Sequence, residues 1–565
     1  TYVNGPLDNS AGAPMGQQLA AFLMGLPGSG SLDLNDNYAE RSSIWGTYIQ
    51  DDWKLTSKLT LNLGLRWEIE QPTTERYNRT VAGFNPTAAL SISGAALANY
   101  AASPIAAVPA NQFKVAGGFT YAGANGVDRG LWQTDRNNFM PRIGLAYSIN
   151  PKTVVRSGFG FFYDQLGIRN RHVSQVGYSQ STAYNASLDS GVTYVAPLAD
   201  PFPNGFVQPV GNSLGAMTSV GNSITFFKPS IKTPYSKRWE FSIQRQIGKQ
   251  ILAEIAYVGN HGSALTTTRQ ANAIPRQYYS TLPTRDQTTI NFFTKNVSNP
   301  FYSMLPGTGL SGTKVAQTQL TRPFPQFTGV SYETNEGYSD YHSLQARLEK
   351  RMSAGLTLSS AYTWSKFLEA TSFLNDTDPA AARVISDQDR THRVVISGLY
   401  ELPFGKGRRF GASVNPVLGK LIEGWQIQSI YQYQSGQAIG FTNAILYGTV
   451  DQIPLSAGER SVDRWFNTDI FERTSSKQLA NNLVTMSPRF SGLRADGLNV
   501  CDVSVMKSTQ LVERVRLQFR TEFINAFNHA MFKAPNTTMT SSAFGKVTAT
   551  SQWPRSIQMS LKLVF

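Results

Sequence analysis

Residues 59–70, LTLNLGLRWEIE, place an apolar side chain at every second position, and the positions between them are polar, charged or glycine. Successive side chains of a strand point to opposite faces, so this period of two predicts a strand with one apolar and one polar face. Soluble strands usually have about five or six residues, whereas a tilted strand crossing a bilayer needs roughly 9–11. Alone, the stretch fits either a bilayer-spanning strand or one face of a large soluble sandwich.

The same alternation recurs along the chain, for example in SIQMSLKLVF at 556–565. Together with 59–70 it predicts about thirteen strands of bilayer-spanning length. The further segments are 43–53, 141–149, 153–163, 238–247, 251–259, 344–350, 356–364, 392–400, 425–434, 499–507, 514–527 and 556–565.

The composition favours a membrane-embedded sheet. Charged residues make up 16% of the 565 residues, whereas soluble domains contain about 25%. Aromatic residues make up 12%, and the chain holds 47 glycines. These values are typical of a transmembrane barrel, which has an apolar outer face, a wet interior and polar loops. No window holds about 18 consecutive apolar residues, so the sequence offers no membrane-spanning helix.

Other features narrow the function classes. The single cysteine, Cys501, excludes an intrachain disulfide framework and a cysteine-based zinc cluster. The net charge of +14 comes without a dense run of Lys and Arg, so we expect no nucleic-acid partner. The chain begins at Thr1 without the segments of a signal peptide, and we expect that peptide to have been removed.

The connections between the expected strands alternate between short and long. The short ones lie at 54–58, 150–152, 248–250, 352–355 and 508–513, and the long ones at about 71–137, 164–236, 261–337, 369–388, 437–496 and 528–555. Outer-membrane barrels have short periplasmic turns and long extracellular loops, so this asymmetry predicts an all-β, antiparallel transmembrane barrel. One short-side connection, 404–424, is unusually long, and we expect a short helix at 416–423.

The strand directions predict further strands before the chain. If the last strand ends on the periplasmic side, the first of thirteen runs the same way, whereas a complete single-chain barrel has an even strand count. We therefore divide the chain into a loop with a short helix at 1–42 and a barrel portion at 43–565. Residues 544–551 are read as a hairpin arm or a fourteenth strand.

Several segments resemble the barrel of TonB-dependent outer-membrane receptors. They are TYIQDDWKLTSKLTLNLGLRWE (47–68), NFMPRIGLAYSINPKTVVRSGFGFFYDQ (138–165), YHSLQARLEKRMSAGLTLSSAYTWSK (341–366), GWQIQSIYQYQSGQ (424–437), RLQFRTEFINAFNHAMF (516–532) and PRSIQMSLKLVF (554–565). They are most similar to the Oar-like group, abundant in acidobacterial genomes, which carries a carboxypeptidase-regulatory-like domain and a plug. GQQLAAFLMGLPGS (16–29) resembles a short helix of these receptors.

This resemblance implies a Gram-negative outer-membrane protein with a 22-stranded barrel, of which this chain would supply the last 13–14 strands. It implies energised uptake of a large or scarce ligand, such as a siderophore, oligosaccharide or peptide. The implied partners are outer-membrane lipid and lipopolysaccharide, the barrel-assembly machinery, an extracellular ligand and, through a missing N-terminal part, the TonB complex. Plug and TonB box are absent from these residues, so we expect a fragment.

Charged residues on the polar parity are the candidate functional residues. In the receptor class such residues hold the plug and line the route that the ligand takes through the barrel. They could also simply keep the barrel interior polar and wet. They are Arg66, Glu68, Arg156, Glu240, Glu254, Arg347, Glu349, Arg516, Arg520 and Glu522. By the same resemblance, Leu561, Leu563 and Phe565 look like the terminal signal read by the barrel-assembly machinery, unless the last strand merely happens to end on Phe.

Other chemistry is weakly indicated. The five histidines form no metal spacing, and we expect no cofactor or metal and no enzyme. Asp387, Asp389 and His392 could form a hydrolytic site on a barrel rim, but a solvated strand end explains them better. Oxygen-rich stretches at 33–37 and 374–378 could bind calcium but follow no EF-hand loop. The alternative functions are a passive porin and a surface adhesion protein.

Overall fold

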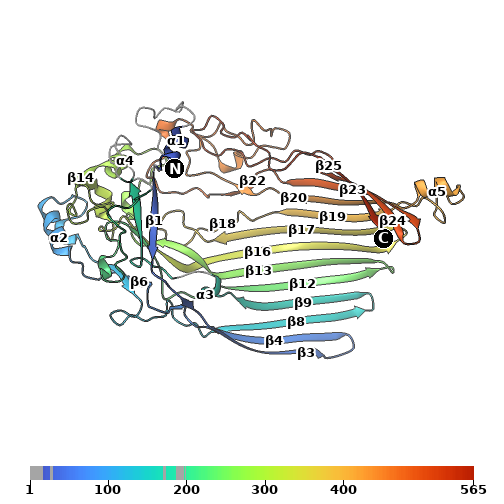
Figure 1. Cartoon of the computed structure of the whole chain (residues 1–565), viewed down its shortest axis with the longest axis horizontal. Helices are drawn as coiled ribbons and strands as arrows, with labels where there is room; N and C mark the ends of the chain where they lie inside the picture. The colour runs from blue at the N-terminus through green and yellow to red at the C-terminus, as the bar shows by residue number, and fades with distance from the viewer. Residues whose placement is uncertain (1–16, 26–28, 170–172, 186–195, 197–198) are drawn as a thin grey trace.

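Thirteen antiparallel strands form one meander in the computed structural model, which describes residues 17–25, 29–169, 173–185, 196 and 199–565 (Figure 1). Each strand pairs with the next along the chain, and β3 and β25 lie at the two edges. The strands are β3 (Ile44–Lys54), β4 (Leu59–Glu70), β8 (Asn138–Asn150), β9 (Thr153–Tyr163), β12 (Tyr235–Ile247), β13 (Ile251–Gln270), β16 (Gly329–Ser353), β17 (Leu356–Ala370), β19 (His392–Glu401), β20 (Trp425–Gln434), β23 (Leu498–Val512), β24 (Val515–Ile524) and β25 (Ser556–Val564). The strand prediction is confirmed.

The tight turns lie at one end of the sheet, together with the longer connection 402–424, and six long connections lie at the other end (Figure 1). Two shorter strands join the sheet at the long-connection side: β11 (Ser223–Phe227) pairs parallel with β16, and β18 (Val384–Ile385) pairs with β17. The helix expected in the unusual short-side connection is α5 (Pro416–Ile422), and the Asn415 side chain caps it by accepting a hydrogen bond from the Leu418 amide at 2.9 Å.

Some expected boundaries were wrong. β13 and β16 stay paired beyond the apolar alternation, so the connection expected at 261–337 spans 271–328. β23 likewise reduces the turn expected at 508–513 to 513–514. Backbone pairing needs no apolar face outside the membrane, so these extensions carry no alternation. Residues 544–551 form no strand; a turn there leads to a single bridge between Phe532 and Thr550.

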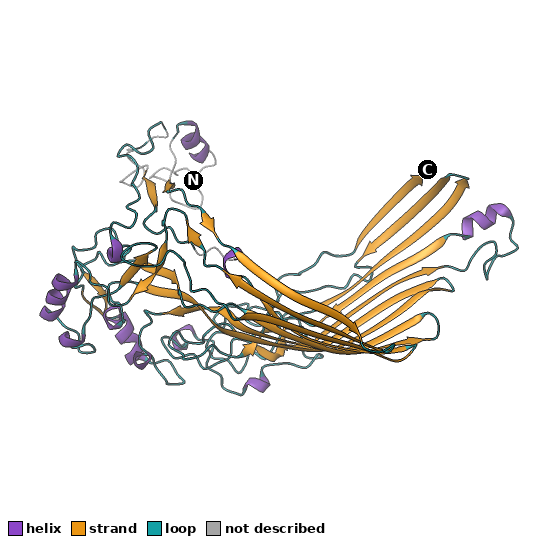
Figure 2. Ribbon diagram, turned by 90° about the horizontal axis from the view of Figure 1, so that it is seen from below, coloured by secondary structure: helices purple, strands orange, loops and turns teal. Residues whose placement is uncertain are grey.

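The strand register keeps the two parities on separate faces across the whole sheet, which curves into a trough (Figure 2). Leu63 lies opposite Ile143, and Phe519 lies opposite Leu561, all on the convex face. Leu63 and Leu561 are 40% and 68% exposed, so no second protein layer covers them. The apolar parity therefore forms an uncovered outer surface, as a wall facing lipid requires.

On the convex face, three histidines mark the end of the apolar band that lies nearest the long connections. The Nδ1 atoms of His261, His342 and His392 lie 2.7, 2.7 and 2.9 Å from side-chain oxygens of Asp340, Tyr257 and Tyr362, in that order. His261 is ten residues from the start of β13 at Ile251, which matches the roughly 9–11 residues of a membrane strand. Above it, the pairing of β13 with β16 shifts register at Ser263–Leu265, as bulges often do at barrel rims.

The described residues before β3 and those of the six long connections, 71–137, 164–234, 271–328, 371–391, 435–497 and 525–555, form what we call the head. It contains short strand pairs and helices. The strands are β1 (Ser29–Asn35) with β10 (Ser179–Asn185), β2 (Glu40–Arg41) with β5 (Thr74–Glu75), β6 (Val81–Asn85) with β7 (Gly118–Tyr121), β14 (Asn296–Ser298) with β15 (Lys314–Ala316) and β21 (Ala438–Ile439) with β22 (Phe490–Arg494). The helices are α1 (Gln17–Leu23), α2 (Ser93–Ala102), α3 (Leu166–Arg169), α4 (Gln287–Thr294) and the 3-10 turns Ala110–Gln112, Gly215–Met217, Arg276–Tyr278, Gln317–Thr321, Val450–Gln452 and Ser475–Lys477.

Two aromatic cores hold the head together. In the first, Tyr100 stacks on Phe113 with ring centroids 3.8 Å apart, and Phe301 and Phe327 are fully buried. The second gathers Phe441, Phe466, Phe471 and Phe544 around Ile453 and Trp465. The long connections are therefore packed structures with their own apolar cores. None of the described helices is long and apolar enough to cross a membrane.

Candidate functional site

The ten candidate charged residues all fall on the concave face, because each alternates with a convex-face residue in the observed register. Several form ion pairs two residues apart on one strand. The Arg66 and Glu68 side chains lie 2.5 Å apart, Arg520 and Glu522 3.5 Å apart, and Arg347 pairs with Glu349.

The remaining four lie singly on the same face. Arg156 donates a hydrogen bond to Gln244 at 2.6 Å, and Glu254 lies opposite Arg347 across the strand pair. Glu240 lies opposite Gly158, and Arg516 opposite Gln510. The register thus gathers all ten on one polar face; their contact with a plug or ligand remains a prediction.

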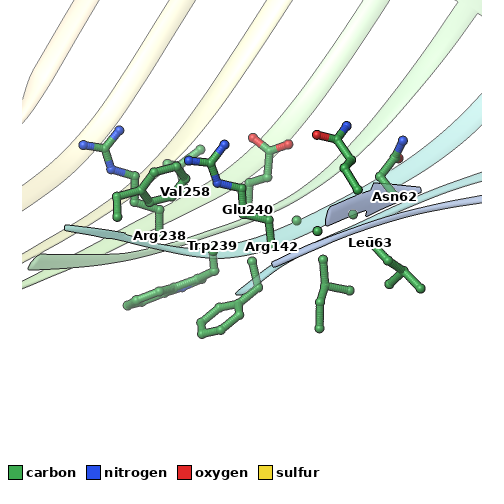
Figure 3. A pocket seen from close by; sticks show the side chains of 15 residues that line it. Asn62, Leu63, Arg142, Arg238, Trp239, Glu240 and Val258 are labelled. Carbon is green, nitrogen blue, oxygen red and sulfur yellow. The ribbon is translucent and has the colours of Figure 1, made fainter. Parts of the chain in front are cut away.

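A hollow of about 480 Å³ opens on the concave face over β4, β8, β9 and β12, and it involves residues that the sequence reading missed (Figure 3). The side chains of Asn62, Arg142, Arg238 and Glu240 rise on the concave side, whereas Leu63 and Trp239 point to the opposite side of the sheet. The floor is formed by the backbone of Gly64, Gly144, Gly158 and Gly160.

The register builds this hollow from two adjacent rows that cross the strands. One row runs Gly64, Arg142, Gly160, Arg238, and the next runs Asn62, Gly144, Gly158, Glu240, Val258. Each arginine is therefore followed or preceded by a position that has no side chain. The sequence did hold a sign of this hollow, namely glycines at the polar positions of the strands. Their alignment across neighbouring strands can be seen only when the strand register is known.

A buried ion-pair cluster joins the sheet to the head. The fully buried Asp389 lies 2.6 Å from the Arg494 guanidinium and accepts a hydrogen bond from the Phe367 amide at 2.6 Å. Arg489 pairs with Glu369 at 2.7 Å beside it. Both carboxylates are therefore held by arginines of the head.

The possible hydrolytic trio does not assemble into a site. Asp389 is held by Arg494, and the His392 ring stacks on Tyr362 and shares a hydrogen bond with its hydroxyl. In the oxygen-rich stretch at 374–378, Asp378 is held by Arg276 at 2.6 Å and by the Asn375 amide at 2.9 Å. The described residues include no group of three His, Cys, Asp or Glu side chains that could hold a metal ion.

Acidification is expected to loosen the second aromatic core through Glu472. The Tyr447 hydroxyl donates to this carboxylate at 2.6 Å, and with Thr474 it lowers the pKa of Glu472 from 4.5 to about 2. Because its pKa is lowered on folding, the ionised Glu472 carboxylate stabilises the folded head above pH 4.5. This contribution to stability disappears as protonation sets in, while the pH falls from about 4.5 to about 2. Near-ultraviolet circular dichroism across this range should show the loss.

The matched variant Glu472→Gln should lack this transition, because it has no carboxylate to protonate. A transition of equal size in the variant would assign the effect to another group.

Comparisons with known proteins concern both the family and the fold. Residues 2–558 match the family model described as "Outer membrane beta barrel domain". Among curated proteins, none matches this chain.

Similar solved structures include the outer-membrane transporter YddB from Escherichia coli, with 10% identity and a TM-score of 0.39 over 93% of this chain and 54% of that one. The ferric-catecholate import receptor Fiu from E. coli K12 has 9% identity and a TM-score of 0.39, over 93% of this chain and 45% of that one. The ferric preacinetobactin receptor BauA from Acinetobacter baumannii has 10% identity and a TM-score of 0.37, over 94% and 43%. The chain thus spans about half the length of these proteins.

Proposed function

The chain belongs to the outer-membrane β-barrel domain family and lies in the cell outer membrane as a multi-pass strand protein, and from that premise we propose that it is the wall and head of a TonB-dependent receptor. In this proposal the receptor is of the Oar-like group and takes up a large or scarce ligand with energy from the inner membrane. Siderophores, oligosaccharides and peptides are the candidate ligand classes.

The observation that carries this proposal is the combination of a charged concave face with a packed head. A wall whose polar face only had to be in contact with water would not require ion pairs such as Arg66–Glu68 and Arg347–Glu349 at fixed positions. Two aromatic cores hold the head in defined shape, as recognition of a specific ligand requires.

The concave-face charges suit contact with a second protein layer. Ion pairs on the wall can exchange partners with the polar surface of a plug, and the ten candidate residues would then hold it. The TonB complex would act on the plug through an N-terminal part beyond these residues.

The unpaired edges of the sheet favour a barrel wall with more strands than these thirteen. Within the described residues, β3 and β25 each pair on one side only. An unsatisfied backbone group in lipid costs several kcal/mol, so further strands would complete the barrel. Leu561, Leu563 and Phe565 are 68%, 44% and 86% exposed on or beside edge strand β25, where the barrel-assembly machinery could bind them.

Energised uptake is tested in cells that carry the native gene. We expect wild-type cells to accumulate one of three labelled probes, a ferric hydroxamate, an oligosaccharide or a peptide, and gene-disrupted cells not to do so. A protonophore should stop accumulation and leave surface binding intact, because only transport draws on the inner-membrane gradient. Accumulation that ignores the protonophore would indicate a porin, and binding without accumulation would indicate an adhesion protein.

A further inference from the structure

We propose that the glycine-floored hollow on the concave face is a binding site for an oxyanion, a carboxylate or phosphate group gripped between Arg142 and Arg238. The site requires only a water-exposed concave face. It therefore stands whether or not the chain takes part in energised uptake.

Of the four floor glycines, Gly64 and Gly158 leave the most room for a Cβ, whereas a Cβ at Gly144 would lie only 3.3 Å from the Asn62 side chain. Gly64 and Gly158 do not have the positive φ that favours glycine, so their backbone conformation is open to other residues. A Cβ added at Gly64 would lie 3.8 Å from its nearest neighbour, the Arg142 Cβ, which is an ordinary contact, and one at Gly158 would lie 3.4 Å from Glu240 Cγ. Glycine weakens a strand, and inside strands it often marks the close approach of a ligand or another backbone.

A shared aromatic ring holds the two arginines in place. The guanidinium carbons of Arg142 and Arg238 lie 4.8 and 5.0 Å from the centroid of the Phe162 ring. Both arginines flank Gly160 across the strands, and a Cβ at Gly160 would lie 3.1 Å from that ring. Phe162 thus leans over the bare glycine and positions one guanidinium group on each side.

These two arginines differ from the paired ones on the same face. Arg66, Arg347 and Arg520 each form an ion pair with a glutamate two residues further along the same strand. Arg238 has Glu240 at the same spacing on β12 but does not pair with it. Among the described residues, Arg142 and Arg238 form no ion pair, and Arg238 donates only to the Ser236 hydroxyl at 3.3 Å.

Unpaired, exposed and oriented guanidinium groups are suited to bind carboxylate or phosphate oxygens with two hydrogen bonds each. Glu240 and Asn62, in the neighbouring row, offer acceptors and donors for hydroxyl groups beside the anion.

The test is calorimetric titration of the full chain, refolded in detergent, with citrate, inorganic phosphate and neutral glycerol at low salt. We expect saturable binding of citrate or phosphate and none of glycerol. The double variant Arg142→Gln, Arg238→Gln should weaken anion binding by at least about tenfold, since each removes a charge-assisted hydrogen bond. Citrate binding alone indicates a carboxylate ligand, and phosphate binding alone indicates a phosphoryl ligand.

Two further variants separate this site from general attraction to a basic protein. Gly64→Ala should fold normally, as shown by an unchanged heat-dependent shift in gel mobility, yet weaken the same anion because its methyl group enters the floor. Arg393→Gln removes the same charge from the concave face of β19, where Thr363 and Gln434 flank it, and should leave binding unchanged. Equal weakening by Arg393→Gln, full binding in the double variant, or no anion binding at all would overturn the proposal.

Discussion

Replacing Asp389 with alanine is expected to lower the free energy of unfolding by about 3–5 kcal/mol, because it leaves the guanidinium group of Arg494 buried without its partner. Asp389 is fully buried and the Arg494 side chain only 16% exposed, so water cannot replace the lost carboxylate. Urea unfolding in detergent micelles measures the change in the free energy of unfolding. Hydrogen exchange at residues 384–390 shows whether the change occurs where the head joins the sheet.

The exposed ion pair between Arg464 and Asp469 provides the matched control. Its side chains are 48% and 73% exposed, so Asp469→Ala should cost less than about 1 kcal/mol. A loss at Asp389 no larger than this control would show that the head is not anchored through the buried pair.

An arginine in place of Ile255 is expected to destabilise the membrane-inserted protein by about 2–4 kcal/mol, the cost of a cationic side chain near the middle of the lipid-facing band. Ile255 is 59% exposed on the convex face, and its cross-strand neighbours Ile243 and Ala346 offer no acid. Folding yield into lipid vesicles across a urea series measures the effect.

Gln345→Arg is the control, because it adds the same charge one position away from Ala346 on the concave face. Its cross-strand neighbours are Ala256 and Thr363, and water reaches that side of the wall. This variant should fold with nearly wild-type yield. Equal losses for both variants would contradict the assignment of the convex face to lipid.

The wall could be predicted from the sequence because the alternation of apolar and polar residues within each strand identifies its two faces. The alternation of 59–70 required no knowledge of other strands, and the observed β4 (Leu59–Glu70) has these bounds. Strand ends were harder to predict where β13 and β16 leave the lipid, since pairing continues there between polar residues such as Thr267 and Thr334. In that region hydrogen bonding between backbones, which the side chains do not reveal, decides the boundary.

The head and the hollow depend on contacts between distant segments. Beside the first aromatic core, the Asn99 side chain donates to the Pro300 carbonyl oxygen, and no local sequence pattern predicts such a contact. The hollow needs Gly64, Arg142, Gly160 and Arg238 to fall in one row, and that row depends on register. A slip of one residue on any strand would move its arginine or glycine to the lipid face.

The uneven length of the strands sets how far the head stands from the apolar band of the sheet. β16 has 25 residues and, at about 3.3 Å per residue, is roughly 80 Å long. An apolar band about 25 Å tall uses only part of that length, even when the strand is tilted. Its remainder extends past the apolar band while still paired with β13, and it carries the neighbouring loops of the head away from that band.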